Sequence, residues 1–71
     1  MTQEEKIEVL AEVLDRDVSE INPEMRLDEI GWDSMAMLGV IAVAKTRFNK
    51  KISGAQIREF QTVQDILDAL D

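Results

Sequence analysis

Apolar residues recur at helical spacing near both ends of the chain. Within residues 3–14 they occupy positions i, i+3, i+4 and i+7, and within residues 63–70 they do so again. Each run follows a threonine with an acidic residue three positions later, Thr2 with Glu5 and Thr62 with Asp65, which is the spacing of a capping box. The pattern therefore predicts a first helix over 3–14 and a last helix over 63–70. Their apolar positions are Ile7, Leu10, Ala11 and Leu14, and Val63, Ile66, Leu67 and Leu70.

The most apolar run, Met35 to Ala44, predicts a further helix from Ser34 to Phe48. Asn49 follows it and tolerates the left-handed conformation that commonly ends a helix. On a helical wheel the apolar residues divide into two sets. We expect the first set to face the core and the second to line the exposed far side: Met35, Leu38, Ile41, Ala42 and Phe48, against Ala36, Gly39 and Val43.

The segment from Asp15 to Trp32 has no sustained period, and its Asn22-Pro23 step signals a turn, so we expect a long loop there. Residues 27–30 are compatible with a short helical turn, and residues 53–60 with a short helix. Together these elements predict one all-α domain over 1–71, a four-helix bundle with a short third helix and a long loop between helices 1 and 2. Six apolar residues would anchor the loop: Val18, Ile21, Met25, Leu27, Ile30 and Trp32.

The net charge of −7 is unevenly placed, with 11 acids and 3 bases in residues 1–34 but 4 acids and 5 bases in residues 35–71. Such a chain is a poor partner for nucleic acid, whose phosphates require basic patches, and a better one for basic protein surfaces. The absence of Cys and His argues against a disulfide, a metal site and intrinsic catalysis. The apolar run is too short for membrane insertion, and we expect a cytoplasmic monomer.

Candidate chemistry is concentrated in Gly31-Trp32-Asp33-Ser34-Met35, where the acidic half ends and the apolar run begins. Asp33 is a favoured N-cap residue, and Gly31 permits a sharp turn before it. Ser34 would then lie in the first helical turn with its hydroxyl in solvent, in a field that favours an attached phosphate. These five residues alone fit two interpretations equally well, a simple capping pair and a serine phosphodiester.

Asp-Ser-Met at the start of a long helix, in an acidic chain of 71 residues, resembles the acyl carrier protein family over essentially the full length. The family motif is Asp-Ser-Leu. The apolar residues after the serine also fall at the family's distances without a gap: Met35, Leu38, Val40, Ile41 and Phe48. The resemblance implies a carrier protein and not an enzyme, with 4′-phosphopantetheine covalently attached to Ser34. It also implies that Asp33 assists a phosphopantetheinyl transferase and that acyl-processing enzymes are the other partners.

The chain departs from familiar fatty-acid carriers in its second helix, where Ala36, Gly39 and the segment 45–47 replace the usual acids. This departure favours a dedicated fatty-acid or polyketide-like pathway, with drift of exposed residues as the alternative. We expect partner enzymes to contact a surface made of Met35, Ala36, Gly39 and Val43.

Other functions stay open. D-alanyl or other aminoacyl carriers can use Asp-Ser-Met, whereas Trp32-Asp33 disfavours a peptidyl carrier. A small acidic interaction module with an unmodified Ser34 is the alternative of another class.

Overall fold

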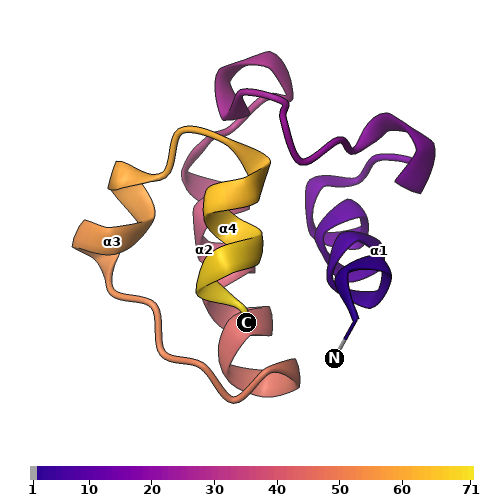
Figure 1. Ribbon diagram of the computed structural model, residues 1–71. Coiled ribbons are helices and arrows are strands. Elements are labelled where there is room, and N and C mark those ends of the chain that lie inside the picture. Colours follow the sequence, from indigo (N-terminus) through magenta and orange to yellow (C-terminus); the bar gives the residue numbers. More distant parts are fainter. Residues whose placement is uncertain (1) are drawn as a thin grey trace.

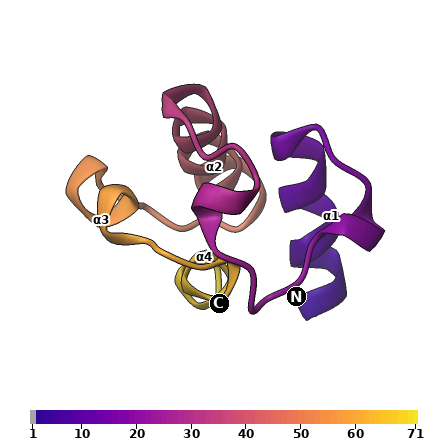
Figure 2. The ribbon, with the colours of Figure 1, turned by 90° about the horizontal axis from the view of Figure 1, so that it is seen from above.

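The computed structural model describes residues 2–71, and four α-helices lie within them: α1 (Gln3–Leu14), α2 (Ser34–Arg47), α3 (Gly54–Glu59) and α4 (Val63–Ala69). Two 3₁₀ turns, η1 (Val18–Glu20) and η2 (Leu27–Glu29), interrupt the long loop. Figure 1 shows α1 and α3 on opposite sides of α2 and α4, and the view from above in Figure 2 agrees. The all-α prediction, with a short third helix and a long first loop, is confirmed.

Each α-helix begins at a polar side chain that accepts a hydrogen bond from a first-turn amide, which satisfies one of the amides left unpaired at a helix start. The capping boxes predicted at Thr2 and Thr62 are both present. Ser53 caps α3, accepting from Gln56 N at 3.0 Å. At the other end of α2, Asn49 has a φ of 55°, so the left-handed conformation predicted there is also confirmed.

The core contains apolar residues from all four α-helices and from the loops between them. Three of the six predicted loop anchors are buried, and Met25 and Trp32 pack partly buried against the core, but Val18 is 46% exposed, so the prediction is wrong for that residue. The central cluster is Leu10, Ala11, Ile21, Leu27, Ile30, Val40, Ala44, Ile52, Ile57, Val63, Ile66, Leu67 and Leu70.

The face of α2 that enters the core is only in part the predicted one: Ile41 and Phe48 are half-buried and pack against the core cluster, as predicted. Met35 and Leu38 are 80% and 66% exposed, and Ala42 is exposed as well. The buried residues of α2 are Ala36, Val40 and Ala44. Because α2 is apolar almost all the way round, its spacing alone could not decide which side turns inward.

Packing of α1 against α2 explains why the small residues of α2 face inward. A Cβ atom built on Gly39 would lie 2.7 Å from Val13 Cγ1, so α1 occupies the space that a side chain at position 39 would need. Gly39 and Val43 are half-buried, and Ala36 is buried. The expectation of an exposed stripe at Ala36, Gly39 and Val43 is therefore wrong, because the segment close to Gly39 is the chain's own first helix.

Backbone hydrogen bonds fasten the long loop to the segment that starts α4. Leu27 N donates to Gln61 O at 2.9 Å, Val63 N to Met25 O at 3.0 Å and Gln64 N to Pro23 O at 2.9 Å. Arg26 and Thr62 also form an isolated antiparallel bridge. These bonds hold the loop on the side from which the chain enters α2. None of the helices within residues 2–71 is long and apolar enough to cross a membrane.

Candidate functional site

The start of α2 is built by the three residues before it. Gly31 has a φ of 73°, the left-handed conformation that glycine adopts readily, and Asp33 is extended. The Asp33 carboxylate accepts a hydrogen bond from Ala36 N at 2.9 Å. Ser34 is the first residue of α2 and is exposed. The sequence-based placement of the turn, the cap and the serine is confirmed.

A cavity of about 240 Å³ opens beside Ser34, between α2 and α3. Leu38 and Ile41 from α2 and Ile57 from α3 make its surface mainly apolar. The α3 side was not predicted, because it depends on how a short helix packs and no local spacing reports that. The full lining is Ser34, Met37, Leu38, Ile41, Gly54, Ile57 and Arg58.

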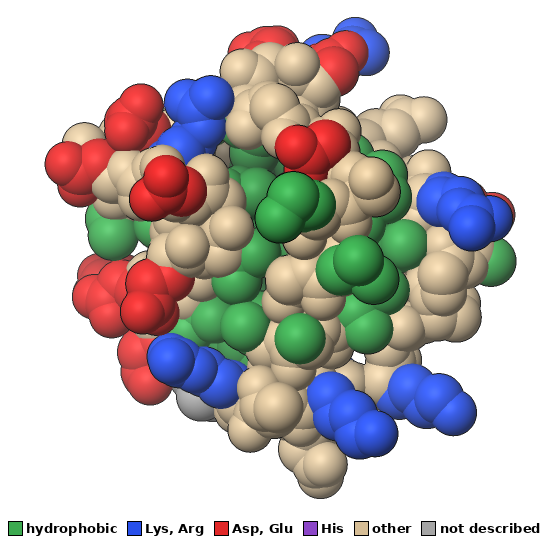
Figure 3. Space-filling model, turned by 180° about the vertical axis from the view of Figure 1, so that it is seen from behind, with side chains coloured by type: hydrophobic (Ala, Val, Ile, Leu, Met, Phe, Trp, Pro, Cys, Tyr) green, Lys and Arg blue, Asp and Glu red, His purple; other side chains and the backbone are tan. Residues whose placement is uncertain are grey.

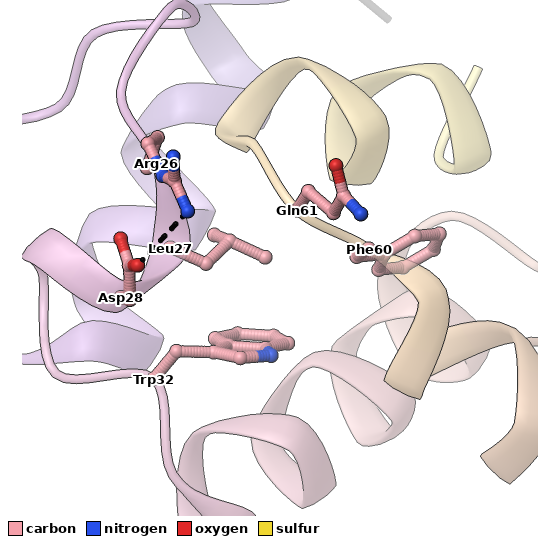
Figure 4. A pocket seen from close by; sticks show the side chains of 6 residues that line it. All are labelled: Arg26, Leu27, Asp28, Trp32, Phe60 and Gln61. Carbon is pink, nitrogen blue, oxygen red and sulfur yellow. Dashed lines mark hydrogen bonds and ion pairs between the residues drawn. The ribbon is translucent and has the colours of Figure 1, made fainter.

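A second hollow, of about 270 Å³, lies between the long loop and the segment that joins α3 to α4 (Figure 4). Trp32 and Phe60 face it from opposite sides, and Leu27, only 2% exposed, lies beside Trp32 and points toward Phe60. Polar side chains complete the lining: Arg26, Asp28 and Gln61. From the sequence, Trp32 was expected only as an anchor of the long loop, and no role was predicted for this hollow.

The surface around α2 combines an apolar centre with charged surroundings. Figure 3, the face opposite to that of Figure 1, shows hydrophobic side chains gathered in the middle, acidic ones mainly on the left and at the top, and Lys and Arg along the lower edge and also at the upper left, top and right. The exposed hydrophobic residues of α2 are Met35 and Leu38. Of the four predicted partner-contacting residues, only Met35 is fully exposed in the structure.

The residues at this site fit a covalently attached phosphopantetheine. The Ser34 side chain is open to a modifying enzyme, and the free amides of the first turn of α2 favour a phosphate there. Two hollows nearby offer space for a flexible arm or its cargo. Within residues 2–71 no group of three His, Cys, Asp or Glu side chains is placed to hold a metal ion.

Comparisons with known proteins agree with this geometry. Residues 7–70 match the family model of the phosphopantetheine attachment site. The acyl carrier protein of Micrococcus luteus is 31% identical over 75 residues, covering 99% of this chain and 93% of the relative. The acyl carrier protein of Myxococcus xanthus is 31% identical over 72 residues, covering 94% and 91%.

The acyl carrier protein of Thermobifida fusca is 28% identical over 72 residues, covering 94% of this chain and 91% of the relative. The similarity thus extends over almost the whole chain and includes the elements that surround the start of α2. The chain belongs to the acyl carrier protein family: it is a carrier and not an enzyme, with 4′-phosphopantetheine as its covalently attached group.

Proposed function

We propose that Ser34 is the attachment residue and that a phosphopantetheinyl transferase recognises Asp33 beside it. The observation that carries this proposal is an exposed serine at the first position of α2, directly after a capping aspartate and at the edge of an apolar cavity. In the modification, the Ser34 oxygen attacks the phosphate of coenzyme A that carries the pantetheine arm, and the hydroxyl proton is released. The pyrophosphate bond of coenzyme A breaks, adenosine 3′,5′-bisphosphate leaves, and the Ser34 oxygen becomes part of the phosphodiester. The terminal thiol of the attached group then holds acyl intermediates as thioesters.

The cavity between α2 and α3 suits the hydrocarbon part of such cargo. Leu38, Ile41 and Ile57 present apolar surface, and transfer of each CH₂ group from water to such surface contributes about 0.8 kcal/mol. Ser34 lies in the lining, so cargo attached through it begins at the cavity edge. Arg58 is exposed at the α3 side and keeps this edge polar.

The partners of this function are acyl-processing enzymes of a dedicated fatty-acid or polyketide-like pathway. Exposed Met35 and Leu38, with the basic residues Lys45 and Arg47 at the end of α2, support a partner surface unlike that of a carrier with an acidic second helix. We therefore keep Met35 in the proposed partner-contacting surface and add Leu38 to it. Ala36, Gly39 and Val43 leave the proposed surface, since they are buried or half-buried.

Intact-mass spectrometry tests the attachment residue. After co-expression with a broad-specificity phosphopantetheinyl transferase, we expect the wild-type protein to gain the mass of one phosphopantetheine and Ser34→Ala to gain none. Ser19→Ala is the matched control, because Ser19 is also exposed but lies in η1, and it should be modified as completely as wild type.

Circular dichroism should show the same helical content in all three proteins. A wild-type protein that stays unmodified, or a Ser34→Ala variant that is modified, would contradict the proposal.

A further inference from the structure

The hollow between Trp32 and Phe60 has a rigid frame. Its two sides are joined by the hydrogen bond from Leu27 N to Gln61 O at 2.9 Å and by the bridge between Arg26 and Thr62. Leu27 is almost fully buried, so the floor is part of the core. A frame of this kind exists before any ligand arrives, which lowers the entropy that binding must overcome.

The lining of this hollow combines the aromatic rings of Trp32 and Phe60 with polar side chains. These polar side chains make almost no hydrogen bonds to one another. The single hydrogen bond among the six lining side chains joins Arg26 Nη2 to Asp28 Oδ2 at 3.2 Å (Figure 4). The indole N–H of Trp32, the amide of Gln61 and the remaining guanidinium N–H groups are not used within the hollow. The hollow thus offers donors, acceptors and apolar faces together.

A secondary amide chain has the matching chemistry. Each amide presents one donor and one acceptor, and the methylene groups between amides can lie on aromatic rings. A phosphate or a free carboxylate fits less well, because the positive charge of Arg26 that would attract it is already offset by the Asp28 carboxylate at 3.2 Å. A purely hydrocarbon chain would make no hydrogen bond to these groups, and Arg26, Asp28 and Gln61, which are exposed, would keep facing water.

A phosphopantetheine arm attached to Ser34 would bring its amide groups close to this hollow. Trp32 precedes Ser34 by two residues, so their Cα atoms are at most about 7 Å apart. A short flexible tether gives a local concentration in the millimolar range, so even weak contacts would be occupied. The apolar cavity between α2 and α3 differs in lining, and it suits hydrocarbon better than amides.

We propose that the hollow between Trp32 and Phe60 binds the amide-bearing part of the phosphopantetheine arm in the unloaded protein. This inference rests on the proposed attachment at Ser34. The Trp32 indole N–H and the Arg26 guanidinium donate to amide carbonyls, and the oxygens of Gln61 and Asp28 accept from amide N–H groups. The ring faces of Trp32 and Phe60 cover the methylene groups.

The chain has one Trp and no Tyr, so its tryptophan fluorescence comes from Trp32, which lines this hollow. In the holo protein, with modification confirmed by intact mass, we expect acrylamide to quench Trp32 at least twofold less efficiently than in the apo protein. The indole N–H cross-peak in ¹H–¹⁵N spectra should also shift between the two forms. Free pantetheine added to the apo protein should reproduce this shift only at millimolar concentration, because it lacks the tether.

Paired variants separate binding from general structural change. Gln61→Ala and Arg26→Ala should each return the indole signal of the holo protein toward its apo value. Gln56→Ala is the matched control, because Gln56 is an exposed glutamine of α3 outside the hollow, and it should leave the holo signal unchanged. Ser34→Ala treated with transferase and coenzyme A should keep the apo signal.

The result that would overturn this inference is a holo protein, confirmed by mass, whose quenching and indole cross-peak equal those of the apo protein. The attachment proposal would then stand and only the hollow's role would fall. A protein that gains no mass at Ser34 would instead refute the attachment proposal itself.

Discussion

At the scale of single residues, Gly39 and Val13 decide how closely α1 and α2 approach. Glycine inside a helix is normally less stable than alanine by about 1 kcal/mol. Here the glycine leaves room for the Val13 side chain, whose Cγ1 would lie 2.7 Å from a Cβ at position 39. A valine in a helix is held in one main rotamer and cannot turn away at low cost. The local preference for alanine is thus opposed by packing.

Because packing and helix preference act in opposite directions, the effect of Gly39→Ala on the free energy of unfolding should change sign when Val13 is shortened. Gly39→Ala should lower the free energy of unfolding of the wild-type protein by about 1 kcal/mol, because overpacking costs about 1 to 3 kcal/mol and outweighs the helix preference. In a Val13→Ala background the same substitution should raise it, since the opposing methyl group is gone. Urea denaturation measures both effects.

Gly54→Ala is the matched control, because a Cβ at Gly54, the first residue of α3, would meet no described atom within 4 Å. It should leave stability unchanged or raise it by a few tenths of a kcal/mol. If Gly39→Ala stabilises the wild-type protein as well, the contact with Val13 is not a constraint on the packing of α1.

At the scale of elements, the start of α4 depends on one carboxylate. Asp65 Oδ2 accepts from Gln61 N at 2.9 Å and from Thr62 N at 3.1 Å, which also ties α4 to the segment bordering the Trp32 hollow. These backbone hydrogen bonds favour the charged form and hold the pKa of Asp65 below its ordinary value. Folding therefore favours the deprotonated side chain.

The lowered pKa of Asp65 predicts how its removal should depend on pH. A group with a depressed pKa stabilises the fold above its unfolded pKa, about 3.9 for Asp, and this stabilisation is lost as pH falls through the folded pKa. Asp65→Asn should therefore lower the free energy of unfolding near pH 7 by about 1 kcal/mol, because a neutral amide oxygen accepts these two hydrogen bonds more weakly than a carboxylate. The difference from wild type should shrink as pH falls from about 5 toward 3.

Chemical denaturation at several pH values measures that difference. Asp68→Asn is the control on the same helix, because the Asp68 carboxylate accepts from the Gln64 side chain and not from a capping amide. A difference between Asp65→Asn and wild type that stays constant with pH would contradict the role assigned to the charged carboxylate.

Elements defined by local spacing could be predicted from the sequence. A capping residue and its partner lie three positions apart, as do Thr2 and Glu5 or Asp33 and Ala36, so the sequence contains the whole interaction. The same holds for the position of Ser34 at the start of α2. The approximate bounds of the helices and the position of Ser34 could therefore be predicted without a structure.

Features that join distant segments could not be predicted in this way. The inward face of α2 depends on a contact between Val13 and Gly39, and the α2 pattern is apolar almost all the way round from Met35 to Ala44. The Trp32 hollow needs Phe60, which approaches only when the loop pairs with the start of α4. Buried Lys6, paired with Asp71 at 2.8 Å, interrupts an otherwise apolar face and was likewise missed.

At the scale of the whole molecule, residues 1–34 hold more acidic side chains than the ion pairs can neutralise. The three bases of residues 1–34 are already paired, Lys6 with Asp71, Arg16 with Glu20 and Arg26 with Asp28. Among the described residues, Glu12 gains Arg47 of α2 as a further partner at 3.6 Å. Most of the 11 acids in this half have no basic partner in the part of the chain that the structure describes. The net charge of −7 therefore leaves self-repulsion that folding must overcome.

Screening should relieve this repulsion and stabilise the fold. Raising salt from about 10 mM to about 200 mM shortens the Debye length from about 30 Å to under 10 Å, which is less than the 18 Å shortest extent of the molecule. We expect Tm, followed by circular dichroism, to rise over this range. The exposed ion pairs weaken with salt at the same time, but pairs of this kind contribute little, so repulsion should dominate.

A variant with fewer acids tests whether repulsion is the cause. Glu8→Gln combined with Glu24→Gln removes two exposed charges, for which no ion pair is found among residues 2–71, and should reduce the salt-dependent rise in Tm. Gln3→Ala combined with Gln56→Ala, which changes two exposed but uncharged side chains, should retain the full rise. A Tm that stays flat or falls with salt in the wild-type protein would mean that the acids are effectively compensated. A basic partner surface would then gain little from relieving their repulsion on binding.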